Sequence, residues 1–176
     1  MKLRTQRTML LAGAYLVISS TSYAADGTIN FTGTVTDQTC TVEAGSANQT
    51  IPMGNVSAKA FRSVGDTALP TKFNIALVSC PDTVKKASIK FDGIYADGNT
   101  TLLSLNKETN AATGIGVALY EADGTTQIPV ASFSNAQSVQ KDIRNVFTYV
   151  AKYMSTSGTV TVGPANATTQ FSISYN

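Results

Sequence analysis

The chain has 176 residues, of which 43% are hydrophobic and 14% are charged, and its formal net charge is +2. The net charge is small and the sequence has no basic stripe, so neither feature indicates nucleic acid or an anionic membrane surface as a partner. Histidine is absent, which excludes Ser-His and Cys-His nucleophilic machinery and histidine metal sites.

The first 24 residues have the pattern of a secretory signal peptide. Three basic residues precede the apolar run MLLAGAYLVI, and small residues stand at the spacing of a signal-peptidase site before Ala25. The apolar run is about half of the ~20 residues that a membrane-spanning helix needs. We therefore expect residues 1–24 to be removed on export, which leaves a mature chain close to neutral.

From Ala25 onward the sequence breaks into short segments that alternate apolar and polar residues, the period of a strand with one buried face. Turns rich in Gly, Asn and Asp separate them. This spacing indicates an antiparallel β-sandwich or barrel in one domain. We predict a short helical turn over 57–61 and strands over 27–35, 72–80, 87–91, 114–121, 145–154, 158–162 and 169–175.

Cys40 and Cys80 are the two cysteines of the chain. Export to an oxidising compartment favours a structural disulfide over metal binding or a catalytic thiol. A bridge that closes a loop of about 40 residues would stabilise the fold by roughly 4 kcal/mol on the chain-entropy model.

Residues that could carry chemistry are few. Two glycines of the predicted strand 114–121 lack the Lys and helix that follow a phosphate loop, and we interpret them as points where the strand closely approaches a neighbour or bulges. Five carboxylates could pair in space as a glycosidase dyad does, but each lies in or beside a turn, where Asp commonly serves local hydrogen bonds. The five carboxylates are Asp92, Asp97, Glu108, Glu121 and Asp123. We predict no catalytic residue, no metal site and no cofactor.

Both ends of the mature chain are apolar alternating segments. In TTQFSISYN a core strand is predicted to run to the last residue, and GTINFTGTV lies within a few residues of Ala25. These segments either pair with each other or pair with other molecules. If the first segment of one copy fills a groove beside the last strand of another, a filament grows head to tail.

Motifs along the whole mature chain resemble the subunits of chaperone–usher fimbriae, the type 1 pilin family of Gram-negative bacteria. INFTGTVTDQTC is similar to the family's apolar-x-Phe-x-Gly opening and first cysteine, QTIPMGNV to its next block, and FNIALVSC to its approach to the second cysteine. ATGIGVALYEADG and YVAKY match two later blocks, with Tyr149 where the family more often has Phe. Gly163 and the penultimate Tyr175 stand where the family marks the C-terminal strand that a periplasmic chaperone recognises.

The resemblance implies an all-β fold: an incomplete immunoglobulin-like antiparallel sandwich over residues 37–176 that lacks its final strand, preceded by a donor-strand extension over 25–36. A periplasmic chaperone would lend a strand during export, and the extension of the next subunit would displace it at an outer-membrane usher. The implied donor strand comprises Gly27, Ile29, Phe31, Gly33 and Val35, with Gly33 at a shallow point of the groove. The implied acceptor groove and chaperone-recognition residues are Gly163, Phe171, Ile173 and Tyr175.

The function implied is that of a structural subunit of an adhesive surface fimbria, exported to the periplasm and then extracellular, with neighbouring subunits as partners and a host receptor as a candidate partner of the assembled fimbria. The alternative is a minor, adaptor or tip-associated subunit that acts mainly as a receptor-binding module. Tip adhesins of the family usually carry a separate lectin domain, whereas this chain has the short extension and one domain. An enzyme on a sandwich fold is the second rival.

Overall fold

The computed structural model describes residues 27–33, 35 and 39–176, so the predicted signal peptide lies outside the described residues. The chain divides into two units between Val35 and Thr36, and each is described by itself. In the first unit the described residues contain no helix or strand. The second unit contains every helix and strand that follows.

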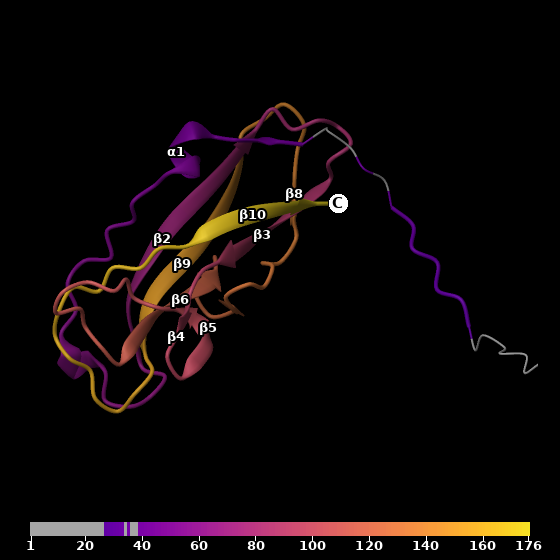
Figure 1. Ribbon diagram of the computed structural model, residues 1–176. Helices are drawn as coiled ribbons and strands as arrows, with labels where there is room; N and C mark the ends of the chain where they lie inside the picture. The colour runs from indigo at the N-terminus through magenta and orange to yellow at the C-terminus, as the bar shows by residue number, and fades with distance from the viewer. Residues whose placement is uncertain (1–26, 34, 36–38) are drawn as a thin grey trace, which may run out of the picture. The chain divides into compact units, whose positions relative to one another are not determined.

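The larger sheet has seven antiparallel strands in the order β1-β2-β9-β6-β5-β4, with β7 beside β6 (Figure 1). Its long central strands carry most of the core. The strands are β1 (Thr41–Val42), β2 (Thr67–Val78), β4 (Tyr95–Ala96), β5 (Asn99–Leu103), β6 (Ile115–Glu121), β7 (Gln127–Ile128) and β9 (Asn145–Ser155).

The smaller sheet has three antiparallel strands in the order β10-β3-β8. Its strands are β3 (Lys86–Asp92), β8 (Gln137–Ser138) and β10 (Gln170–Tyr175). β10 pairs with β3 without a break, and Figure 1 shows it in yellow as an edge strand. β10, the last strand of the sequence, is therefore paired along one edge and unpaired along the other.

Helices are short. The predicted helical turn over 57–61 is confirmed as η1 (Ala58–Ala60), whereas α1 (Ala44–Ala47) was not predicted. Among the described residues, no helix combines the length and the apolar character that a membrane span requires.

The core lies between the two sheets; Phe91 and Tyr149 are fully buried in it, and the half-buried Phe73 packs against them. The Phe91 ring centroid lies 5.2 Å from that of Tyr149 and 6.0 Å from that of Phe73, and edge-to-face contacts of this kind add to the burial of apolar area. The hydroxyl groups of Tyr149 and Ser134 share a hydrogen bond at 3.1 Å. Burial raises the pKa of Tyr149 to about 12, so its hydroxyl stays neutral. The bond to Ser134 satisfies this hydroxyl inside the core, whereas a Phe at this position would have no hydroxyl to satisfy.

All seven residues of β6 are buried because this strand has apolar contacts on both faces. Alternate residues point into the main core, and Ala118 and Tyr120 join a second cluster on the opposite face with Val150. The interpretation of its glycines is confirmed. A Cβ at Gly116 would lie 2.8 Å from the carbonyl oxygen of Leu103, so β5 and β6 approach more closely there than a side chain allows.

The predicted strands after residue 72 are present except GTVTV. Residues 159–162 form no strand, because their hydrogen bonds go to a loop: the Thr161 N–H donates to the carbonyl oxygen of Thr113 at 3.1 Å, and the Thr113 N–H donates to the Thr161 hydroxyl at 2.8 Å. That prediction was wrong, since alternation alone does not supply a neighbouring strand.

Candidate functional site

An open groove of about 970 Å³ exposes the inside of the sandwich. One wall is formed by residues 46–55 and the other by residues 165–169 and Phe171. The floor consists of core side chains from both sheets, which a complete sandwich would cover with a further strand. These floor residues are Phe73, Ile75, Phe91, Leu103, Val117, Leu119, Ala151 and Tyr153.

Beside the groove, β10 presents an unpaired backbone edge. Asn176 and Lys86 exchange two backbone hydrogen bonds of 2.9 Å across β10 and β3. Because hydrogen-bonding groups alternate in an antiparallel ladder, the N–H and C=O groups of Phe171, Ile173 and Tyr175 point to the other edge. No strand within the described part of the chain pairs with that edge. The groove is thus bordered by a row of backbone donors and acceptors ready for a strand.

The opposite wall also has free backbone. Residues 48–56 form no backbone–backbone hydrogen bond within 39–176, and the Gln49 side chain anchors this stretch by donating to the carbonyl oxygen of Asn74 at 3.1 Å. Met53 and Val56 pack their side chains against the core. An inserted strand would therefore meet hydrogen-bonding groups on both sides.

The second wall is held in place by polar contacts. The Asn166 side-chain amide donates to both carboxylate oxygens of Glu108, at 3.1 and 3.2 Å, and the Asn106 N–H donates to the carbonyl oxygen of Asn166 at 2.7 Å. The Tyr153 hydroxyl donates to the carbonyl oxygen of Ala165 at 2.9 Å. These contacts fix the second wall to the 106–108 loop and to the floor residue Tyr153.

The four residues predicted for the acceptor groove lie in three places. Phe171 lines the groove. Ile173 and Tyr175 are half-buried against the core further along β10. Gly163 lines a separate pocket of about 80 Å³, whose other lining residues are apolar apart from Thr161.

Gly163 has a packing reason to be glycine. Its φ is 156°, and a Cβ there would collide with the carbonyl oxygen of Asn110 and lie 2.7 Å from the backbone nitrogen of Ala112. The segment before β10 therefore passes against the 110–112 loop backbone to backbone, a close approach that only glycine allows.

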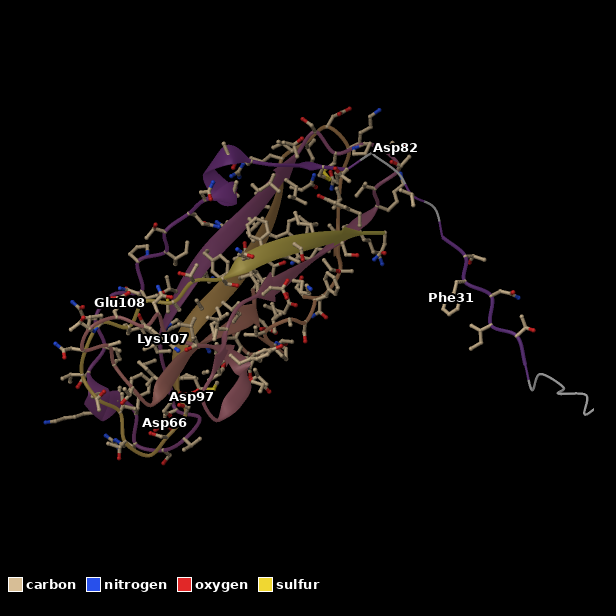
Figure 2. The ribbon with its side chains drawn as sticks, viewed as in Figure 1. Phe31, Asp66, Asp82, Asp97, Lys107 and Glu108 are labelled. Carbon is tan, nitrogen blue, oxygen red and sulfur yellow. A yellow bond between two sulfur atoms is a disulfide. The ribbon has the colours of Figure 1, made fainter. Side chains whose placement is uncertain are left out.

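The five residues predicted for the donor strand are all described. Ile29 and Phe31 are 80% and 93% exposed, and Val35 is fully exposed; Figure 2 labels Phe31 on this segment. A Cβ at Gly27 or Gly33 would meet no atom within 4 Å. The segment thus carries exposed apolar side chains at alternate positions.

The predicted disulfide is confirmed: Cys40 and Cys80 are joined, 40 residues apart in sequence. The bond ties the residue before β1 to the end of β2. Asn145 adds a polar contact here, with its amide nitrogen 3.6 Å from the Cys80 sulfur.

Four of the five carboxylates weighed as an enzyme's dyad have separate local partners. Glu121 accepts the Asn135 N–H at 2.6 Å, and Glu108 is bound by Asn166. Asp123 accepts the Thr126 hydroxyl at 2.6 Å, and that bond with the backbone N–H groups of the turn lowers the pKa of Asp123 to about 2. Asp92 pairs with a lysine at 3.1 Å. In Figure 2, Asp97 and Glu108 lie toward the end of the sandwich opposite Asp82.

Sequence reasoning missed most of both walls. One weak signal was present: Ala165 and Ala167, at alternate positions before β10, pack against the core as Phe171 does. Residues 46–55 carry no such periodicity, so the first wall could not be read from a pattern.

The model of the family described as fimbrial protein matches residues 29–176. The chain belongs to the fimbrial protein family. Its relatives include long polar fimbria protein A of Salmonella typhimurium, 32% identical over 179 residues that cover 99% of each chain. A type-1 fimbrial protein subunit of Serratia marcescens is 33% identical over 179 residues, covering 95% of this chain and 98% of the relative.

Solved structures agree with this family membership. A Burkholderia pseudomallei antigen and type I fimbria protein is 32% identical, with a TM-score of 0.61 over 80% of this chain and 91% of that chain. The P pilus rod subunit PapA has a TM-score of 0.65 at 23% identity, over 78% of this chain and 99% of that chain, and shows the fold alone. The predicted incomplete immunoglobulin-like sandwich and the predicted family are confirmed, and the protein is a structural fimbrial subunit.

Proposed function

We propose that this fimbrial subunit polymerises by donor-strand exchange, in which residues 27–35 of one copy fill the groove of another. The observation that carries the proposal is the groove with an apolar floor beside the unpaired edge of β10. The exposed, alternating Ile29, Phe31 and Val35 have the complementary pattern. Adding an extended segment to an open sheet edge is a common mode of peptide recognition, with backbone bonds giving affinity and alternate side chains giving specificity.

The sizes and energies suit this exchange. Nine residues in extended form span about 30 Å, the length of a sandwich strand. Burying three large apolar side chains contributes roughly 5–9 kcal/mol before the cost of ordering the segment is subtracted. Gly33 interrupts the apolar pattern, and we infer that it faces a shallow point of the groove where a side chain would not fit.

The open edge needs a temporary cover before assembly, because a free strand edge above an apolar groove invites aggregation. We infer that a periplasmic chaperone lends a strand to β10 and that the next subunit replaces it at an outer-membrane usher. Residues 1–24 serve as the export signal, and the finished subunit is part of an extracellular fimbria. The role is structural, and catalysis forms no part of it.

The experiment is thermal unfolding of the mature chain, residues 25–176, with and without a peptide of residues 25–36. The peptide is expected to raise the melting temperature and suppress polymer, because it completes the sandwich. A peptide with Phe31→Asp is the matched control and should do neither, since a charge cannot enter an apolar groove without cost. Indifference of the chain to the natural peptide would overturn the proposal.

A further inference from the structure

Two long strands, β10 and β2, each have an edge that is largely free of a neighbouring strand, and the two edges differ in how open they are to a further strand. Within residues 39–176, β4 and β8 are edge strands of two residues each, too short to template another strand. β10 has six residues and β2 has twelve, of which β1 covers two, pairing with Leu77 and Val78. β2 is therefore a second candidate for unwanted strand addition.

Near β1, side chains take the place of a neighbouring strand. The Glu43 N–H donates to the carbonyl oxygen of Ala76 at 2.9 Å, and the Ala76 N–H donates to the Ser46 hydroxyl at 2.9 Å. Ser46 is buried, and both groups of Ala76 are thereby satisfied. The next outward-facing carbonyl, that of Asn74, accepts from the Gln49 side chain at 3.1 Å. α1 and the residue after its cap thus continue the β1 ladder without being a strand.

Further along, β2 has the features that discourage pairing. Lys72 is exposed, Pro70 lacks an N–H, and the pairing with β9 is irregular between Ala68 and Thr71. Leu69 within that irregularity has a φ of 52°, outside the range of a regular strand.

β10 has none of these features. Its register with β3 is unbroken from Gln170 to Tyr175, and its sequence QFSISY contains no proline and no charged residue. The contrast between two long edges of one domain requires an explanation.

We propose that Ser46 and Gln49 close the edge of β2 with their side chains and, with the irregular stretch 68–71, confine strand addition to β10. The closed edge would otherwise accept a strand from a second copy of this chain. That the strand added at β10 is residues 27–35 rests on the proposed function; the closure of β2 rests on the contacts above.

The test compares the mature chain with a Ser46→Ala/Gln49→Ala variant, each saturated with the peptide of residues 25–36 so that β10 is occupied. Hydrogen exchange of the Ala76 amide, followed in dilute solution where both proteins are monomeric, reports the edge, and sedimentation velocity at higher concentration reports self-association. We expect Ala76 to exchange about tenfold faster in the variant, the loss expected for one hydrogen bond, and the variant to self-associate while the wild type stays monomeric. Gln137→Ala/Ser138→Ala, at two β8 positions whose side chains make no hydrogen bond in the described residues, is the matched control and should behave as wild type.

Two results would overturn the inference: unchanged exchange at Ala76, or faster exchange in a variant that remains monomeric. Wild-type chain that keeps polymerising in saturating peptide would instead contradict the proposed function. If the double variant is not recovered folded, Gln49→Ala keeps the buried Ser46 bond, and it must still show increased self-association relative to wild type for the inference to stand.

Discussion

The hydroxyl of Tyr175 donates to the carbonyl oxygen of Cys40 at 3.4 Å, so the end of β10 meets the disulfide. Cys40 is bonded to Cys80 beyond the end of β2. This contact joins the smaller sheet to the larger one at one end of the sandwich, while the groove lies toward the other end of β10, where Phe171 lines it. Tyr175 and Cys40, which belong to two separate motifs of the sequence, thus meet at the same end of the sandwich.

Removing the disulfide should weaken this end of the sandwich. Cys40→Ser is expected to lower the free energy of unfolding by about 4 kcal/mol, the value for a loop of this length, and to reduce the yield of chaperone-bound subunit. Denaturant unfolding and the periplasmic yield check this. An unaltered yield, or two free thiols in the wild-type protein, would remove the disulfide from the account.

Gly163→Ala should destabilise the subunit by about 1–3 kcal/mol, because the new methyl group collides with the backbone of residues 110–112. Gly45→Ala is the matched control, since a Cβ at Gly45 meets nothing within 4 Å. Denaturant unfolding of both variants decides the point. Equal stability of the Gly163 and Gly45 variants would show that Gly163 is not held by packing.

Gly33→Leu tests the shallow point inferred for the groove. Within a single chain a side chain at Gly33 meets nothing, so the variant's own sandwich should be as stable as wild type. Subunit addition should slow by at least tenfold, the equivalent of about 1.4 kcal/mol lost in the transition state. Filament growth followed by light scattering measures it, and wild-type growth rates would mean that Gly33 is incidental.

Asp123 links stability to pH. Its pKa is lowered to about 2 by the hydrogen bonds of the turn, from the Thr126 hydroxyl and from the backbone N–H groups of Thr126 and Thr125. A carboxylate with a lowered pKa stabilises the fold above its ordinary pKa, and that stability is lost as the pH falls from about 4 to about 2.

Acid unfolding of an Asp123→Ala variant checks the effect. The variant should have a lower melting temperature at neutral pH and a shallower further loss between pH 4 and 2 than wild type. Asp97→Ala is the matched control, because Asp97 also precedes a glycine in a turn and its carboxylate has no hydrogen bond in the described residues. Parallel pH curves for all three proteins would contradict the assignment.

The sequence predicted the features that local patterns encode. Alternation located β3, β6, β9 and β10, and the cysteine count in an exported chain predicted the disulfide. β5 was missed because NTTLL follows turn residues and is too short to show a period. The groove's first wall was missed because residues 48–56 have no regular structure, and GTVTV was mistaken for a strand because its partner proved to be a loop. The sequence could not predict the tertiary arrangement, that is, which segments lie beside one another.

The central claim is that Phe31 of one copy enters the groove of another. The chain contains no tryptophan, so Phe31→Trp places a single fluorescent reporter at a side chain that is 93% exposed in the unassembled subunit. On assembly the emission should shift to the blue, as the indole leaves water for the groove, whereas Asn30→Trp on the opposite face of the segment should shift far less. Filaments whose Phe31→Trp emission stays at the wavelength of exposed indole would contradict donor-strand exchange.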